Sequence, residues 1–552
     1  MSGIDALADE YIDAWFKAQP WRASIYGLPG DHDLLPDLSF EAEQARRAEL
    51  LDFVTRAETL RAGTLSAQES VTADVVIQQA KAAVDAIDSR TIEFVVSDGL
   101  SSPALQLLVG LPIISLNDEE KAGGFLSRLA ALPSYLDTLN ARHRRALADG
   151  LIPPEFLIDA GVAYLDRYLA EPDGDPLRIS ATVEVEGFEQ ERDRLLADVV
   201  RPAYQRYRDF LVTELKPHGL PEDKPGLCWL PGGDEKYAAL IRVHTTTERS
   251  AQDLHDTGLD LIAKLADEYS ELGARVFGTL DLAEIFERLR TDPALRWRDG
   301  DELLESARET IARAESVSPQ WFSTIPEQKC EVRAVPESEA EGGTIAYYFE
   351  PALDGSRPGI YFANTFDAHK RPRHAGEAIA FHEAVPGHHF QLSTALGLTE
   401  LPLLRRIADI NSYIEGWGLY AERLADEMGL YSGDVAKFGM LTQDSMRAGR
   451  LVVDTGLHAL GWSRQQAVDY LRDNTPMAPM EIEAEIDRYA ANPGQALSYM
   501  VGRLEIERIR AEATVALGEK FDIRAFHDVV LGSGNLPLPV LEAVVAAWVA
   551  TV

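Results

Sequence analysis

The chain has 552 residues, of which 46% are hydrophobic and 26% charged, a composition typical of a globular protein with a large buried core. Its 53 basic and 90 acidic residues give a formal net charge of −37, which opposes the phosphate contacts that nucleic-acid binding requires. Two widely separated cysteines argue against a disulfide scaffold and favour a reducing compartment. The N-terminus has no basic segment followed by an apolar core, and the apolar run VVAAWVATV is far shorter than a membrane span. We therefore expect a cytoplasmic protein with neither a nucleic-acid nor a membrane partner.

Successive amphipathic helices are predicted for residues 1–220. The segments FEAEQARRAELLDFVTRAETL and GFEQERDRLLADVVRPAYQRYRDFLVTEL carry apolar residues at intervals of three and four. A stretch rich in Pro and Gly follows, KPHGLPEDKPGLCWLPGGDEKY, so we place a boundary there between an N-terminal helical lobe (1–220) and a second lobe (221–552). AALIRVHTTT is interpreted as a strand, ahead of another helical stretch.

The most strand-like region spans about 329–365. Its β-branched and aromatic runs KCEVRAVP, GTIAYYFEP and GIYFANT are separated by the turn signal DGSRPG. From residue 376 onward the pattern is helical again. The sequence thus predicts a mainly α protein with one small sheet just ahead of a cluster of histidines.

A His-Glu pair followed by two more histidines lies in FHEAVPGHHFQL, residues 381–392. In zinc hydrolases such a histidine binds the metal and the glutamate after it acts as general base, the roles we expect for His382 and Glu383. An unbroken helix would place the second ligand four residues after the first, but that position is Pro386. The motif therefore needs a different geometry.

Either of the two later histidines could be the second ligand. Pro386 and Gly387 can kink or widen the helix, so that His388 returns to the face of His382. His389 would share that face in a regular helix, but roughly 10 Å further along the axis. We favour His388 and keep His389 as the alternative.

A third protein ligand is expected, because catalytic zinc usually takes three and leaves one position open. Glu415 in NSYIEGWGLYAERLADEMG is the best candidate, since the intervening chain is long enough for a loop and a returning antiparallel helix. Glu422, seven residues on, could hydrogen-bond a ligating histidine. The sequence thus predicts one zinc ion per chain.

Hydrolysis of an amide also needs a hydrogen-bond donor for the oxyanion. Candidates are Tyr420, Tyr499 and His458, the last in RLVVDTGLHALGW on a helix face that it shares with Arg450 and Asp454. Asp454 could orient the imidazole and raise its pKa. The alternative is that all of them belong to packed helix surfaces.

Substrate contacts are expected from two further groups. Tyr361 and Asn364 lie in the predicted strand pair, whose edge could bind an extended peptide, although a core hairpin is an equal alternative. Arg447, Arg450 and Arg503 could hold a substrate carboxylate, or pair with surface acids instead.

The blocks HEAVPGHH, EGWGLYAERL, RLVVDTGLHALGW, DGSRPGIYFANT and NPGQALSYMVGRLEI resemble the bacterial "domain of unknown function 885" family over nearly the whole chain. That family is regarded as a zincin-like group of metallopeptidases. The resemblance implies a large helical gluzincin-like fold with a deep cleft, similar to carboxypeptidase Taq and the neurolysin-like oligopeptidases. It implies ligand roles for His382, Glu415 and one histidine of the pair, with Glu383 as base. Dipeptidyl peptidase III, with its own stretched histidine spacing, supports His388 by analogy.

The expected function is a zinc-dependent peptidase that cleaves short peptides, of oligopeptidase or carboxypeptidase type. A zinc amidase or esterase acting on a small molecule would use the same residues. A non-catalytic helical metal-binding protein is the third alternative, although such a site would have no use for Glu383. The substrate sequence, the end that is cleaved and the oligomeric state do not follow from these patterns.

Overall fold

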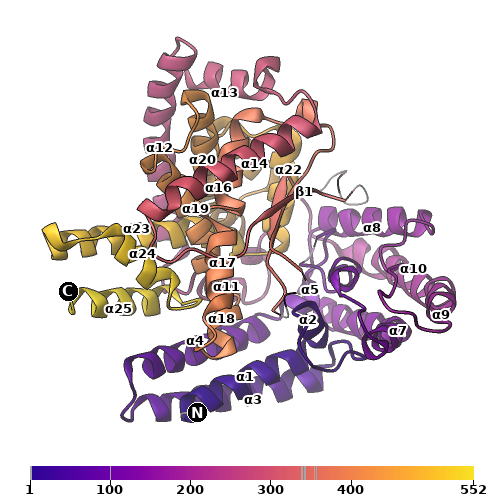
Figure 1. The fold of residues 1–552 in the computed structure, drawn as a ribbon. Helices are drawn as coiled ribbons and strands as arrows, with labels where there is room; N and C mark the ends of the chain where they lie inside the picture. Colours follow the sequence, from indigo (N-terminus) through magenta and orange to yellow (C-terminus); the bar gives the residue numbers. More distant parts are fainter. Residues whose placement is uncertain (1–2, 100, 337–339, 341–343, 354, 356) are drawn as a thin grey trace.

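The computed structural model describes residues 3–99, 101–336, 340, 344–353, 355 and 357–552. The chain is mainly helical with a small three-stranded sheet, as predicted (Figure 1). The helices before the sheet are α1 (Gly3–Ala18), α2 (Pro20–Ile25), α3 (Phe40–Arg61), α4 (Ala67–Ser89), α5 (Thr91–Phe94), α6 (Gln106–Gly110), α7 (Glu119–Ala148), α8 (Glu155–Ala170), α9 (Phe188–Leu195), α10 (Arg201–Phe210), α11 (Gly233–Thr245), α12 (Ala251–Val276), α13 (Leu282–Thr291) and α14 (Gly300–Val317). Those after it are α16 (Gly376–Glu383), α17 (His388–Gly397), α18 (Leu403–Ile407), α19 (Asn411–Glu427), α20 (Asp434–His458), α21 (Arg464–Asn474), α22 (Pro479–Ala491), α23 (Ser498–Leu517), α24 (Ile523–Leu531) and α25 (Leu538–Val549). None of the helices described is both long and apolar enough to cross a membrane.

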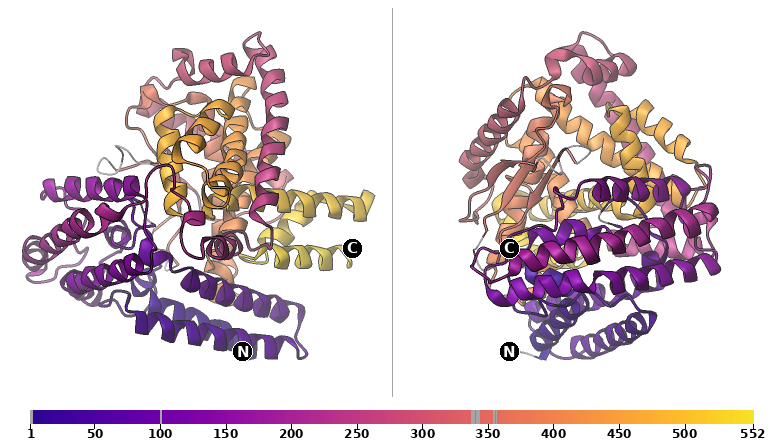
Figure 2. Two further views of the ribbon diagram at one scale, coloured as in Figure 1. Left: turned by 180° about the vertical axis from the view of Figure 1, so that it is seen from behind. Right: turned by 90° about the vertical axis from the view of Figure 1, so that its right-hand side faces the viewer.

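The first 220 residues divide between two hydrophobic cores. Helices α1, α3 and α4 pack beneath α11, α18 and α25 and share the large core that contains α16, α19 and α20 (Figure 1). Helices α7 to α10 enclose a second core and form a separate group of long helices (Figure 2). The predicted boundary near residue 220 therefore does not coincide with the division between the cores.

The two helices predicted from the first amphipathic segments are confirmed as α3 and as the run from α9 to α10. The predicted strand AALIRVHTTT is wrong, because residues 233–245 form helix α11. Its apolar residues Leu240 and Ile241 are buried against neighbouring helices, and the Thr245 hydroxyl donates to the carbonyl of Ile241 one turn back. A short apolar run fits either element when its period is ambiguous, and here tertiary packing selects the helix.

The sheet consists of β1 (Glu331–Ala334), β2 (Ala346–Phe349) and β3 (Ile360–Ala363), all within the predicted region. Their order is β1-β3-β2, with β1 parallel and β2 antiparallel to β3. The sheet lies beside α14 and α16. Strand β3, which carries Tyr361, is therefore paired on both sides and cannot be the edge expected to bind a peptide.

Helices α19 and α20 run through the middle of the large core, and α23 crosses α19 at very close range. The crossing occurs at two glycines: a Cβ on Gly416 would lie 2.5 Å from the Cα of Gly502, and a Cβ on Gly502 would lie 1.8 Å from the carbonyl oxygen of Ser412. Side chains at these positions would push the helices apart. The two glycines therefore set the position of α19 relative to α23.

Candidate metal centre

The two histidine-bearing segments are separate helices. Helix α16 ends at Glu383 and α17 begins at His388, with four non-helical residues between them and a cis peptide bond before Pro386. Pro386 has no N–H to continue the helix, and its carbonyl accepts a hydrogen bond of 2.8 Å from the indole N–H of Trp417. The expected kink within one helix is thus corrected to a full break.

This break brings His382 and His388 to the same carboxylate. Their Nε2 atoms lie 3.5 and 3.3 Å from Oε2 of Glu415, which α19 supplies. The two imidazole rings stand edge to face, with centroids 4.6 Å apart. One ligand atom from each of the three residues lies within 4.8 Å of those of the other two. The three side chains predicted as metal ligands are therefore gathered in one place.

The donor set and its dimensions could hold a zinc ion. Four ligands placed tetrahedrally at about 2.0–2.2 Å from zinc are separated from one another by about 3.3–3.6 Å, close to the two distances to Glu415. The two imidazoles also pack closely against the backbone of α19 at Gly418. A Cβ on this residue would lie 2.8 Å from Cε1 of His382 and 3.0 Å from Cε1 of His388. The helix that supplies Glu415 can approach both rings only because this residue is glycine.

Glu422, about two helical turns beyond Glu415, contacts the other ring nitrogen of His382. Its Oε1 lies 2.8 Å from Nδ1 of His382, the contact predicted for it, and its side chain is fully buried. Burial alone would lower the pKa of His382, but the hydrogen bonds with Glu415 and Glu422 raise it to about 9. Burial would raise the pKa of Glu415, yet its contacts with His382 and His388 hold that pKa well below the ordinary value. The carboxylates therefore favour positive charge between them, which a proton or a metal ion could supply.

Glu383 and Tyr499, the residues predicted as general base and oxyanion donor, lie next to the cluster. Glu383 follows His382 on α16, and its carboxylate adds to the effect of burial in raising the pKa of Tyr361. The ring of Tyr499 lies 6.4 Å from that of His382, centroid to centroid. Burial first, and then the charge of Glu415, raise the pKa of Tyr499, so its hydroxyl keeps its proton at neutral pH. Of the predicted oxyanion donors, Tyr499 is therefore the one placed beside the cluster.

His389, the alternative second ligand, points elsewhere. Its Nδ1 lies 2.9 Å from the hydroxyl of Tyr348, and its Nε2 lies 2.9 Å from the carbonyl oxygen of Gln328. Both nitrogens thus have partners in or near the sheet. Because α17 begins anew at His388, adjacent residues on it point about 100° apart, so only one of the two can face α19.

Tyr420 and His458 are not brought to the cluster. One ring nitrogen of His458 accepts a hydrogen bond from the N–H of Leu227, and the other faces the carbonyl of Tyr489. Both partners are distant in sequence from the clustered residues. Tyr420 is buried, with its hydroxyl against Nε2 of His527. Both residues lie on well-packed helices, as the alternative interpretation stated. None of the contacts described for them reaches the three clustered residues, so their donor role stays a prediction.

Asp454 does not orient His458. It accepts a hydrogen bond of 2.5 Å from the hydroxyl of Tyr237 and another from the N–H of Gly494. Burial raises the pKa of this carboxyl to about 7. Four-residue spacing placed the two side chains on one helix face, but each of them finds a partner on a different neighbouring helix.

Of the residues predicted to contact substrate, some are engaged elsewhere in the fold and one lies near the cluster. The side-chain amide of Asn364 donates to the carbonyls of Ala340 and Thr344, within its own loop region. Arg503 forms ion pairs with Asp444 and Glu507. These two residues therefore serve the fold. Arg450, in contrast, lies over the ring of Tyr499 near the cluster.

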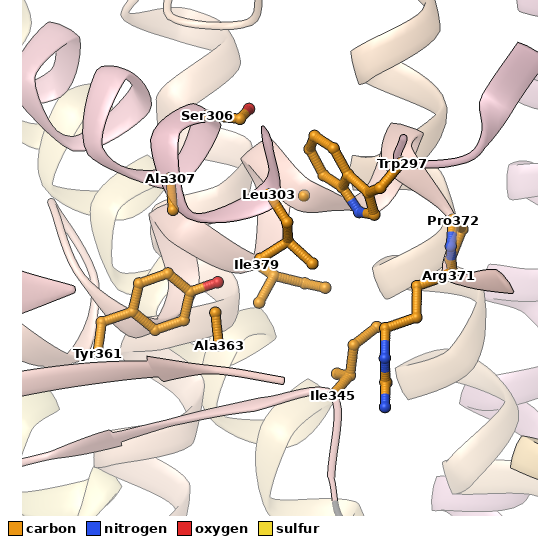
Figure 3. A pocket seen from close by; sticks show the side chains of 11 residues that line it. Trp297, Leu303, Ser306, Ala307, Ile345, Tyr361, Ala363, Arg371, Pro372 and Ile379 are labelled. Carbon is orange, nitrogen blue, oxygen red and sulfur yellow. The ribbon is translucent and has the colours of Figure 1, made fainter. Parts of the chain in front are cut away.

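A small, mainly apolar pocket lies between α16, α14 and β3 (Figure 3). Leu303, Tyr361 and Ile379 line it, with Arg371 at one end (Figure 3). The described residues that line this pocket include none of the three clustered ligands. A deep cleft over the cluster therefore stays a prediction.

Two residues that support the site were not singled out from the sequence. Gly418 gives the imidazoles their space, and Trp417 holds the interrupted turn through Pro386. The signal was present as the segment EGWG, because two glycines inside an otherwise strong helical pattern usually have a packing reason. The same segment supplies Glu415, so one turn of α19 both presents one candidate ligand and makes room for the other two.

The fold and this cluster define a large, mainly helical protein with a buried His-His-Glu centre. The chain belongs to the family described as "Bacterial protein of unknown function (DUF885)", whose profile matches residues 20–545. The crystal structure of a "putative lipoprotein" from Colwellia psychrerythraea is 28% identical, covers 100% of this chain and 99% of that one, and superposes with a TM-score of 0.90. A "putative lipoprotein of unknown function" from Shewanella oneidensis, 17% identical over 99% of this chain and 100% of that one, has the same fold with a TM-score of 0.74. A comparison with curated proteins gave no match.

Proposed function

We propose that this protein is a zinc-dependent hydrolase, a zincin-like peptidase that cleaves short peptides. The observation that carries the proposal is the convergence of His382, His388 and Glu415, with Glu383 directly after the first histidine. Two imidazoles and a carboxylate are a donor set typical of catalytic zinc, and three protein ligands leave a position open for chemistry. A structural site would have no use for a neighbouring general base.

In this proposal the chain's own residues perform the proton transfers. His382, His388 and Glu415 would hold the zinc ion, which when bound supplies Lewis acidity that polarises a carbonyl group. Glu383 would take a proton from the attacking water and pass it to the leaving amine. Tyr499, protonated at neutral pH, would donate a hydrogen bond to the developing oxyanion. Glu422 would keep the ring of His382 in orientation.

Metal analysis of the purified protein beside the Glu383→Gln variant tests the proposal. We expect one zinc per chain in both proteins, with hydrolysis of a mixed peptide library by the wild type alone. A Glu427→Gln variant is a matched control, because Glu427 lies on α19 in an exposed ion pair with Arg510 and should retain activity. No stoichiometric metal in the wild type, and no activity after zinc is added, would refute the proposal.

The same experiment separates the alternatives. Esters and simple amides assayed with the peptide library distinguish a peptidase from a small-molecule amidase or esterase. Bound zinc with no turnover of any substrate would indicate a metal-binding protein without catalysis. A cytoplasmic location is part of the proposal, and the lipoprotein names of the two solved structures make a membrane-anchored form the alternative that cell fractionation would test.

A further inference from the structure

Two buried arginines lie over the ring of Tyr499, next to the candidate metal centre. The guanidinium carbons of Arg447 and Arg450 lie 5.5 and 4.5 Å from the centroid of that ring. Both come from α20, three residues apart, and their side chains are almost fully buried, with 8% and 4% of each residue exposed. The ring of Tyr499 itself lies 6.4 Å from that of His382. The arginines are thus close neighbours of the cluster.

The arginines near Tyr499 outnumber the carboxylates that pair with them directly. Arg450 pairs with Glu485 at 2.8 Å, and Arg488 uses the same carboxylate at 2.9 Å. Arg447 donates only to the side chain of Gln443, and among the described residues no carboxylate lies within 4.0 Å of it. A buried guanidinium that no carboxylate contacts is costly, and Glu422 and Glu481 act on Arg447 only from a distance.

Two N–H groups of these arginines also lack a hydrogen-bond acceptor. Nε of Arg447 and Nη1 of Arg450 are buried and have no hydrogen-bond partner among the described residues. Glu481, on the same helix as Glu485, is exposed, and burial raises its pKa while the charges of Arg447 and Arg450 lower it. The unpartnered N–H groups of the two arginines could donate to a bound anion.

The distances suit the end of a peptide. An extended chain advances about 3.3–3.6 Å per residue. The ring of Tyr499 lies between the two guanidinium groups and the ring of His382. The distance from the arginines to the cluster therefore corresponds to one to three extended residues. A carboxylate is the anion that a guanidinium binds with two parallel hydrogen bonds.

We propose that Arg447, assisted by Arg450, binds the C-terminal carboxylate of a peptide substrate, so that cleavage falls within three residues of the carboxyl end. This inference rests on the proposed peptidase function and adds to it the end at which the substrate is held. It makes Arg447 and Arg450 substrate-binding residues. Arg503, the third arginine predicted for this role, is excluded because its charge is already paired with Asp444 and Glu507.

The test compares two libraries of N-acetylated hexapeptides, identical except that one has free carboxyl termini and the other has C-terminal amides. The acetyl group removes aminopeptidase cleavage from consideration. We expect the wild type to shorten the free acids from the carboxyl end and to cleave the amides at least about 30-fold more slowly, the loss typical when one partner of a buried charge pair is removed. Mass spectrometry of the products gives the position of cleavage.

Variants then assign the effect to the residue. Arg447→Gln should remove the preference for free acids by raising their KM at least about 30-fold, while the rate on amides and the zinc content stay near those of the wild type. Arg447→Lys should restore part of the preference, because the charge returns without the two-pronged geometry. Lys437→Gln is the matched control, since Lys437 lies at the start of the same helix in an ion pair with Asp426.

The outcomes separate this inference from the function on which it rests. Equal cleavage of both libraries, or cleavage more than three residues from the carboxyl end, would overturn the carboxylate site and leave the peptidase intact. Loss of the preference in Lys437→Gln would overturn the assignment to Arg447. Failure of the wild type to cleave either library would refute the peptidase and this inference with it.

Discussion

Replacing Gly418 with alanine is the most direct perturbation of the site that leaves every proposed ligand in place. The added methyl group would lie 2.8 Å from Cε1 and 2.9 Å from Nε2 of His382, and 3.0 Å from Cε1 of His388. All three distances are shorter than van der Waals contact, so at least one imidazole must move. Overpacking of this kind costs about 1–3 kcal/mol. If that cost falls on the zinc-bound state, the dissociation constant of zinc rises about 5- to 150-fold.

A matched glycine separates this effect from helix propensity. Gly123 lies in α7 with nothing within 4 Å of an added Cβ, so Gly123→Ala should leave zinc binding unchanged and stabilise the protein by about 0.5–1 kcal/mol. Titration of zinc against a competing chelator measures the affinity, and thermal unfolding of the metal-free protein measures stability. A Gly418→Ala protein that binds zinc within twofold of the wild type would refute the argument that this glycine makes room for the ligands.

The same assays serve three further predictions. Glu422→Gln should weaken zinc binding about 10- to 100-fold, because a neutral amide holds the imidazole of His382 less firmly, and an unchanged affinity would contradict this role. His388→Gln should abolish stoichiometric zinc, whereas His389→Gln should keep it and lose about 1–3 kcal/mol of stability with its buried hydrogen bonds; the reverse pattern would show that the wrong histidine has been assigned. Acid should destabilise the fold, because four buried histidines have pKa values lowered by burial to about 3 or 4: His143, His374, His458 and His527. Below pH 6.5 the unfolded chain binds protons that the folded one does not, so each should cost about 1.4 kcal/mol per pH unit until its folded pKa is reached. A melting temperature that does not fall between pH 6.5 and 5 would contradict this expectation.

Much of the architecture could be predicted because it depends on local periodicity. The long amphipathic segments became α3 and the run from α9 to α10, and the β-branched and aromatic runs became the three strands. Hydrophobic periodicity alone does not determine which helices and strands lie next to each other in the fold. It did not show that β3 is the central strand, nor that α1, α3 and α4 would share a core with the C-terminal half of the chain.

The candidate site was predictable to the extent that residue type constrains chemistry. His382, His388 and Glu415 were chosen as donors that zinc accepts, and the structure gathers them. Asp454 and His458 were chosen because they share a helix face, but a shared face does not say which neighbour that face meets. Their partners, Tyr237 and the backbone at Leu227 and Tyr489, are separated from them by up to 231 residues, and such contacts are not encoded locally.

The break between α16 and α17 has a consequence for how zinc motifs are recognised in sequences. The usual pattern, with two histidines four residues apart, assumes an uninterrupted helix that carries both. In this chain the candidate ligands His382 and His388 are six positions apart, and the second lies at the start of a new helix that is held by contacts such as that of Trp417 with Pro386. A search by spacing alone would pass over such a chain. A search for a His-Glu pair, a proline-glycine interruption and a later Glu-Gly-aromatic-Gly helix would find it, because those residues encode the geometry instead of the interval.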